Sequence, residues 1–230
     1  MARERIPPRA SINESLRNNA LTAFLASESL ILFVAAPLSA IGVKAPLLLA
    51  GLLSTTLLLA IVIISSSTGA RILTSIATIL AVAGIGFRID QPSLITVWLG
   101  HLAFFAALLG ISTVIFQAVF APGRITHHRI AGAVVLYLNL ALAFTSIYRL
   151  IQELRPGAFA GASAQEPEVV AVSNLLYFSF TTLTSTGFGE ILPIDPFARS
   201  MANLESVLGQ LYLAILLARL VTMHVEAQRK

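Results

Sequence analysis

The sequence predicts an all-α integral membrane protein with six transmembrane helices and a short re-entrant helix and loop between the fifth and the sixth. Of the 230 residues, 57% are hydrophobic and only 11% are charged, whereas a soluble domain carries about 25% charged residues. Six apolar runs approach or exceed the ~20 residues that a helix needs to cross a bilayer. A seventh apolar stretch, 169–183, is too short to span and is followed by polar residues and glycines.

The six predicted spans are separated by short breaks, except for a long connection between the fifth and the sixth. The first span contains Glu28, and Pro37 is expected to kink it because proline lacks the N–H that a helix needs. The third span is the shortest. The ranges are 20–43, 46–65, 71–87, 94–120, 130–151 and 199–225. They divide the chain into an N-terminal arm (1–19), a peripheral four-helix region (20–120), a linker (121–129) and a last unit (130–226).

The placement of basic residues predicts the orientation, because Lys and Arg concentrate on cytoplasmic loops. With the N-terminus inside, nine basic residues lie inside and three lie outside. We therefore expect a multi-pass protein of the cell (plasma or inner) membrane, surrounded by lipid, with both termini cytoplasmic. The inner set is Arg3, Arg5, Arg9, Arg17, Arg71, Arg124, Arg129, Arg229 and Lys230, and the outer set is Lys44, Arg88 and Arg155.

Several function classes are excluded or disfavoured by composition. The chain has no Cys, which removes disulfides and thiolate chemistry. Its net charge of +4 fits the setting of orientation better than nucleic-acid binding, so no nucleic-acid partner is expected. No constellation for covalent catalysis and no organic cofactor is expected either.

Residues 184–190, here called the TSTGFGE segment, follow the short apolar stretch, whose helix we expect Ser173 or Asn174 to cap and Thr182 to end. Non-helical backbone at membrane depth is tolerated only where it is buried in protein or lines a watery cavity. A potassium ion that loses its water needs closely spaced oxygens, which backbone carbonyls supply when they point the same way. Gly187 and Gly189 permit the unusual backbone angles that this requires.

Residues 177–193 (YFSFTTLTSTGFGEILP) resemble the pore loop of tetrameric potassium channels, whose usual filter reads TVGYGD after an apolar helix that ends in T-x-T. The two glycines match. Ser185 stands where the family usually has Thr, and Thr186 where it has Val or Ile. Phe188 replaces Tyr, and Glu190 replaces Asp. The resemblance extends over about 130–225, including Gly209, which falls where the family has a gating-hinge glycine.

The resemblance implies a homotetramer in which monovalent cations, chiefly potassium, pass through a central selectivity filter, and a pore domain at 130–226. It implies that the ions are bound by Ser185, Thr186, Gly187, Phe188 and Gly189. It also implies that the filter is supported by Thr181, Thr182, Thr184, Glu190 and Glu205. Phe188 is expected to buttress the filter from behind. Gly209 is a gating-hinge candidate, although small residues are common at packed membrane helices.

Three further features of the sequence concern the support and the gating of the filter. Glu205, costly at membrane depth, could contact the re-entrant helix near Thr181 or Thr186, or face the cavity. The Thr186 side chain should point behind the filter and needs a polar partner there. The span 94–120 contains no Arg or Lys, so the gating charges of a voltage sensor are missing and no strong voltage gating is expected.

Other functions compete with a potassium-selective channel. Ser185 and Thr186 keep open a weakly selective channel for potassium and sodium. A non-conducting structural or regulatory subunit is a further alternative. A secondary transporter with a broken helix would show inverted internal repeats, and no repeat is evident in the sequence.

Overall fold

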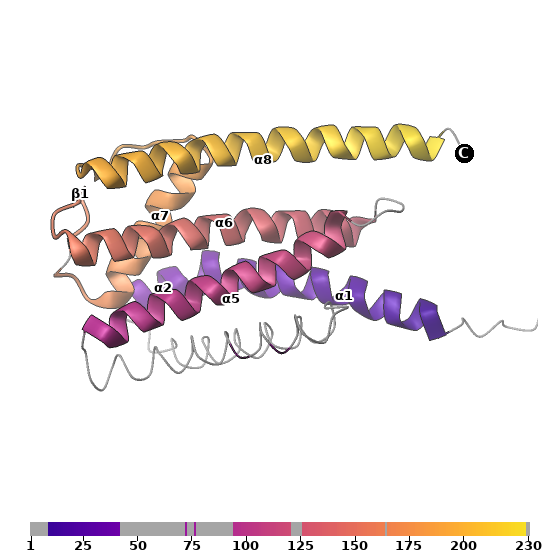
Figure 1. Cartoon of the computed structure of the whole chain (residues 1–230), viewed down its shortest axis with the longest axis horizontal. Helices are drawn as coiled ribbons and strands as arrows, with labels where there is room; N and C mark the ends of the chain where they lie inside the picture. The colour runs from indigo at the N-terminus through magenta and orange to yellow at the C-terminus, as the bar shows by residue number, and fades with distance from the viewer. Residues whose placement is uncertain are drawn as a thin grey trace, which may run out of the picture.

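The computed structural model describes residues 9–41, 72, 76, 94–120, 126–163 and 165–228, and the architecture of this part is almost entirely helical (Figure 1). Two short strands, β1 (Phe159–Ala160) and β2 (Leu192–Pro193), pair antiparallel, with Phe159 opposite Pro193. The helices are α1 (Arg9–Leu30), the π-helix η1 (Ile31–Ala35), α2 (Ala36–Ala40), α5 (Leu94–Phe120), α6 (His127–Leu154), α7 (Glu168–Leu183) and α8 (Pro196–Gln228).

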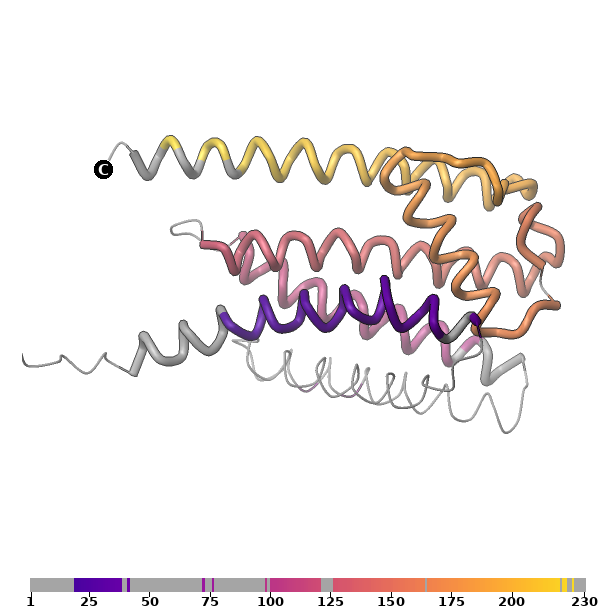
Figure 2. The backbone as a smooth tube through the Cα atoms, turned by 180° about the vertical axis from the view of Figure 1, so that it is seen from behind, coloured from indigo at the N-terminus to yellow at the C-terminus, as the bar shows by residue number. Residues whose placement is uncertain are grey.

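The long helices α1, α5, α6 and α8 run side by side, and the short helix α7 is inclined between α6 and α8 (Figures 1 and 2). The start of α1 and the end of α8 lie at the same end of the bundle, and the β1–β2 pair lies at the other (Figure 1). Four helices of the described part are long and apolar enough to cross a membrane, over Asn19–Leu38, Gly100–Phe120, His127–Leu154 and Pro196–Arg219.

The segment before Pro37, where the sequence suggested a kink, forms a π turn. In η1 the Ala36 N–H donates to the Ile31 carbonyl, and the residues on either side, Leu30 and Ala36, keep helical angles. Proline has no N–H and its ring crowds the carbonyl four residues before it, while a π turn inserts one residue into the hydrogen-bond ladder. The π turn thus directly precedes the proline, and the helical path continues through it.

Helix α6 is the centre of the fold, because α1, α5, α7 and α8 all contact it. On the α1 and α5 side, Leu21, Phe24, Ile115 and Val135 belong to one buried apolar cluster. On the α7 and α8 side, a second cluster contains the aromatic rings of Phe144, Tyr148, Phe159 and Phe178. The rings of Tyr148 and Phe178 meet edge to face with centroids 5.0 Å apart. These contacts fix the inclination of α7.

The helix boundaries differ from those expected in four places, one of which is α8, since it spans Pro196–Gln228 and not 199–225. α6 begins at His127 and ends at Leu154, longer at both ends than 130–151. α7 begins at Glu168 after Pro167, and not near Ser173 or Asn174; proline is pre-organised for a helix start because its φ is fixed. α1 begins at Arg9, within the segment expected to be an arm. The spans expected at 46–65 and 71–87 lie outside the described residues, apart from the helical positions 72 and 76.

Candidate functional site

The C-terminus of α7 passes directly into the TSTGFGE segment, whose first amides fold back onto the helix. The Ser185 N–H donates to the Thr182 carbonyl at 2.9 Å. The N–H groups of Thr186 and Gly187 both donate to the Thr181 carbonyl, at 2.8 and 3.1 Å. These bonds satisfy carbonyls at the helix end that have no partner within the helix.

The same bonds fix the direction of the carbonyls in the segment. In a trans peptide the carbonyl of one residue points opposite to the N–H of the next. Since the N–H groups of residues 185, 186 and 187 point back to α7, the carbonyls of Thr184, Ser185 and Thr186 point away from it. Residues 184–190 are all exposed in the single chain. The carbonyls of Thr184, Ser185 and Thr186 are therefore candidate ligands for a cation.

The backbone of the segment has a positive φ at every second residue: 56° at Ser185, 57° at Gly187 and 84° at Gly189. Glycine adopts these angles freely, whereas other residues adopt them at a cost. A Cβ added at Gly187 or Gly189 would meet nothing within 4 Å. Backbone conformation, and not space, is therefore the reason for glycine at these two positions. Ser185 is the one non-glycine residue with a positive φ among the described residues.

The Thr184 and Thr186 hydroxyls form a local chain behind the turn. Thr184 Oγ1 donates to the Phe180 carbonyl at 2.7 Å, and Thr186 Oγ1 lies 2.8 Å from Thr184 Oγ1. Thr181 Oγ1 donates to the Phe178 carbonyl at 2.9 Å. The polar partner that Thr186 was expected to need is thus the neighbouring Thr184.

Ser185 connects the segment to α8. Its Oγ accepts a hydrogen bond from Gln210 Nε2 at 3.0 Å and lies 3.3 Å from Ser206 Oγ. Ser206 and Gln210 are four residues apart, so they lie on the same face of α8. The hydroxyl of Ser185 is therefore engaged by α8, whereas its carbonyl points away from α7.

At the other end of the segment, Phe188 and Glu190 both contact Tyr177 of α7. The rings of Phe188 and Tyr177 stack with centroids 6.2 Å apart and an interplanar angle of 4°. Tyr177 Oη donates to Glu190 Oε2 at 3.0 Å. One side chain of α7 thus supports the outer half of the segment both by stacking and by a hydrogen bond.

Glu205 of α8 is fully buried and bonds to the re-entrant helix α7, which is one of the two arrangements that the sequence left open. Its Oε2 accepts from Tyr148 Oη of α6, and its Oε1 contacts Ser179 Oγ of α7, both at 2.5 Å. The sequence placed this bond near Thr181 or Thr186, and it is formed by Ser179 because Ser179 and Leu183, one turn apart, form the face of α7 that meets α8.

At Gly209, α8 packs close against the backbone of α7. A Cβ at this position would lie 2.2 Å from the Leu183 carbonyl oxygen and 3.0 Å from Leu183 Cδ1. The same carbonyl also accepts from Tyr137 Oη of α6 at 3.2 Å. Glycine is therefore required at this position for close packing, since any side chain would displace the end of α7.

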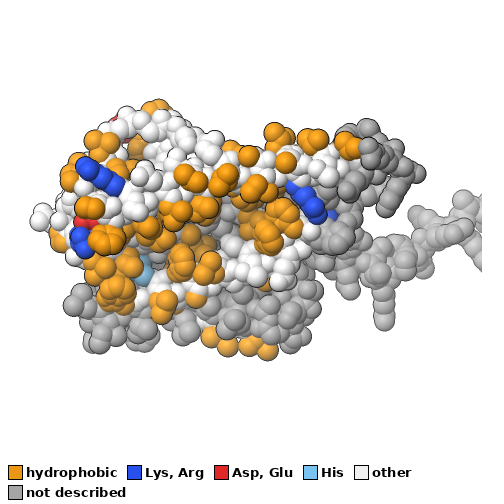
Figure 3. Space-filling model, turned by 45° about the horizontal axis from the view of Figure 1, so that its top comes forward, with side chains coloured by type: hydrophobic (Ala, Val, Ile, Leu, Met, Phe, Trp, Pro, Cys, Tyr) orange, Lys and Arg blue, Asp and Glu red, His pale blue; other side chains and the backbone are white. Residues whose placement is uncertain are grey.

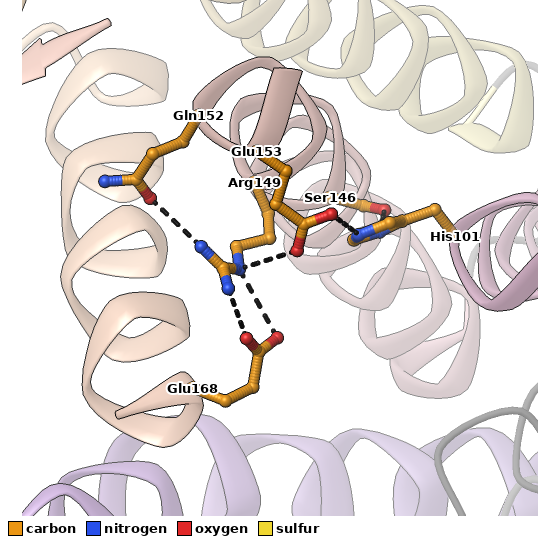
Figure 4. Close-up of polar contacts among 6 residues, drawn as sticks. All are labelled: His101, Ser146, Arg149, Gln152, Glu153 and Glu168. Carbon is orange, nitrogen blue, oxygen red and sulfur yellow. Dashed lines mark hydrogen bonds and ion pairs between the residues drawn. The ribbon is translucent and has the colours of Figure 1, made fainter. Parts of the chain in front are cut away.

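The N-terminus of α7 is fixed by a polar cluster around Arg149 of α6 (Figure 4). Arg149 pairs with Glu168, the first residue of α7, through both Nε and Nη2. Its Nε also lies 3.2 Å from Glu153 Oε1. His101 Nε2 of α5 lies 3.2 Å from Glu153 Oε2. The cluster joins α5, α6 and α7 and is completed by Ser146 and Gln152.

We expect Arg149→Met to destabilise the protein, because it removes the guanidinium that faces two carboxylates while keeping most of the apolar side-chain volume. The Arg149 side chain is only 9% exposed and that of Glu168 is 45% exposed, so the loss lies between a surface pair and a buried one, about 1–3 kcal/mol. Arg155→Met is the matched control. Arg155 pairs with Asp195 but is 52% exposed, and we expect a loss of about 1 kcal/mol or less. Thermal unfolding in detergent measures the loss of stability of both variants. Equal shifts of the thermal midpoint would contradict a larger contribution of Arg149 than of Arg155.

Helix α8 buries only a narrow stripe and exposes a wide apolar surface. The buried positions Ala198, Ala202, Glu205 and Gly209 recur at intervals of three or four residues. On the face shown in Figure 3, many hydrophobic side chains gather along the middle, and Lys and Arg lie toward the two ends of the described part. The exposed apolar residues of α8 include Leu204, Val207, Leu208, Leu211, Leu213, Ile215, Leu217, Val221 and Val225.

The structure brings most of the expected site residues together at the junction of α7 and α8. Sequence reasoning missed the residues that hold them: Tyr137, Tyr148, Tyr177, Ser179, Ser206 and Gln210. Two signals in the sequence could have indicated some of them. Gln210 lies directly after Gly209, and the four-residue spacing of Ser179 and Leu183 places both on one face of the helix. The described residues contain no group of three or more His, Asp or Glu that could hold a metal ion.

Comparison with known proteins finds similarity to ion channels. Residues 132–226 match a family model described as an ion channel. The chain is 30% identical over 119 residues to Protein LctB of Bacillus caldotenax, which covers 50% of the chain and 88% of that protein. It is 32% identical over 75 residues to the inward rectifier potassium channel Kirbac3.1 of Paramagnetospirillum magnetotacticum. That match covers 33% of the chain and only 21% of the channel. No solved structure matches significantly.

Proposed function

Because the chain belongs to the potassium channel family, as a multi-pass membrane protein with an ion channel domain, we propose that it is a passive potassium-selective channel and not an enzyme. The observation that carries this proposal is the TSTGFGE segment. Its carbonyls at Thr184, Ser185 and Thr186 point away from α7, and positive φ angles alternate along it. Carbonyl rings of this kind replace the hydration shell of a potassium ion.

In this proposal the permeant ions are bound by residues 185–189 and the surrounding residues hold the filter in shape. The carbonyls of Thr181 and Thr182 accept hydrogen bonds from the filter N–H groups, and the Thr184 hydroxyl donates to a carbonyl of α7. Glu190 is held by Tyr177, and Glu205 and Gly209 fix the position of α7. The C-terminus of α7 carries partial negative charge, which favours a cation nearby.

The pore is proposed to form in a homotetramer, since one chain supplies one strand of carbonyls and an ion needs to be surrounded. The exposed apolar surface of α8 supports this assembly, because it is available for both lipid and neighbouring subunits. Gly209 is assigned mainly to packing, in view of its contact with Leu183, and hinge motion at this residue remains a secondary proposal.

The proposed organisation keeps the order expected from the sequence. Residues 1–19 form a cytoplasmic arm, 20–120 a peripheral region, 121–129 a cytoplasmic linker and 130–226 the pore domain, in the cell membrane with both termini cytoplasmic. The shared position of the start of α1 and the end of α8 supports an even number of crossings (Figure 1). With no Arg or Lys in α5, the channel is proposed not to be strongly voltage-gated.

Reconstitution of the purified protein into planar bilayers, for currents, and into liposomes, for ion flux, tests the proposal. With potassium and sodium on opposite sides of a planar bilayer, we expect single-channel currents whose reversal potential lies near that of potassium. Saturable flux without channel currents would instead indicate a transporter. The absence of any potassium flux from correctly assembled protein would favour a non-conducting structural subunit.

A second candidate is a channel that discriminates weakly between potassium and sodium. The contacts of Ser185 favour it, because the hydroxyl that could complete the innermost ring of oxygens is engaged by Gln210 and Ser206. A filter with fewer ligands at its inner end would hold potassium less specifically. In the same bilayer experiment this candidate predicts a reversal potential near zero.

A further inference from the structure

The hydrogen-bond contacts around the Glu205 carboxyl group outnumber the hydroxyl protons available to them. Glu205 is 0% exposed, and within the described part of the chain it forms no salt bridge. Its two carboxyl oxygens meet two hydroxyls, Tyr148 Oη and Ser179 Oγ, each at 2.5 Å. Ser179 Oγ also lies 2.8 Å from the Ala141 carbonyl oxygen of α6. There are thus three close oxygen–oxygen contacts but only two hydroxyl protons.

A third proton on Glu205 satisfies every contact. Tyr148 donates to Glu205 Oε2, and Glu205 Oε1–H donates to Ser179, which in turn donates to the Ala141 carbonyl. With an ionised Glu205, Ser179 would have to donate to the carboxylate. Its approach to Ala141, which already accepts from Thr145 Oγ1 at 2.8 Å, would then contain no proton. An ionised carboxylate buried without a cation is also far more costly than a neutral acid.

We propose that Glu205 is a neutral carboxylic acid whose proton completes a hydrogen-bond chain from α8 through α7 to α6, and that Glu205, Tyr148 and Ser179 are positioning residues for the filter. They act on the filter by fixing the position of α7 along α8. Glu205 and Gly209 are one turn apart on α8, and they meet Ser179 and Leu183, one turn apart on α7. These two contacts together set the direction in which the end of α7 presents residues 184–190.

The proton is tested by infrared spectroscopy of the full chain in lipid bilayers, with Glu28→Gln as the background. Glu28 is the other glutamate with a buried side chain among the described residues, so this variant removes its contribution. We expect a carbonyl stretching band of a protonated carboxylic acid that disappears when Glu205→Gln is added. If no such band depends on Glu205, the residue is ionised and the proposal is overturned.

The positioning role rests on the proposed channel function and is tested by potassium flux in liposomes. Glu205→Gln should keep the parent rate, because the amide donates to Ser179 and accepts from Tyr148 as the neutral acid does. Glu205→Leu should reduce flux about tenfold or more, since it leaves two buried hydroxyls without their partner. A Glu205→Leu variant that conducts like the parent would overturn the positioning role. Absence of flux in the parent would overturn the channel function alone, because the infrared result does not depend on conduction.

Discussion

We expect Gly187→Ala to abolish or sharply reduce the potassium flux of the proposed channel. Gly187 has a φ of 57°, an angle that costs an alanine about 1–2 kcal/mol. The chain can relieve this strain by rotating the peptide between Thr186 and Gly187, which would break the N–H bond to Thr181 and turn the Thr186 carbonyl away from its neighbours. In a tetramer the change occurs in four strands around the same ions. We therefore expect flux to fall by at least about tenfold, the factor that corresponds to 1.4 kcal/mol.

Gly157→Ala is the matched control for this experiment. Gly157 also has a positive φ, 88°, and a Cβ there would likewise meet nothing within 4 Å. It lies in the connection between α6 and β1, outside residues 184–190 in the chain. The two variants therefore carry a similar backbone cost and should show similar losses of thermal stability. Only Gly187→Ala should lose flux in liposomes, and equal flux in both variants would contradict a filter role for the TSTGFGE segment.

The sequence was most informative where function depends on backbone conformation. Gly187 and Gly189 could be assigned from the sequence because glycine is the residue that adopts positive φ without cost, and the structure has positive φ at both. The roles of the TSTGFGE residues in ion binding remain predictions. A helical membrane protein was predicted from the lengths of the apolar runs. The similarity to ion channels and the four long apolar helices of the described part confirm a mostly helical membrane protein.

The partners of buried polar residues could not be predicted in the same way. Glu205 was expected to bond the re-entrant helix near Thr181 or Thr186 or to face the cavity, and it bonds that helix at Ser179, together with Tyr148 of α6, which the sequence did not indicate. These contacts depend on how α7 crosses α6 and α8, which is set by packing between residues far apart in sequence. The π turn before Pro37 was missed for a related reason: proline predicts a disturbance of the helix, whereas the form of the disturbance depends on its surroundings.

Gly209→Ala is expected to destabilise the protein even though alanine is the better helix former. A Cβ would lie 2.2 Å from the Leu183 carbonyl oxygen, which is backbone and cannot move aside as a flexible side chain could. The helices must separate, and overpacking of this kind costs about 1–3 kcal/mol. Since Leu183 directly precedes the TSTGFGE segment, the same shift displaces the proposed filter. We expect both a lower thermal midpoint and a large loss of potassium flux.

Gly100→Ala provides a control with the opposite sign. Gly100 lies within α5, and a Cβ there would meet nothing within 4 Å, so only the helix preference remains, a gain of about 0.5–1 kcal/mol. Thermal unfolding in detergent should therefore move upward for Gly100→Ala and downward for Gly209→Ala. If Gly209 acted only as a hinge, its alanine variant would follow Gly100 in stability and differ only in channel opening. A lower midpoint would instead assign Gly209 to the contact between α7 and α8.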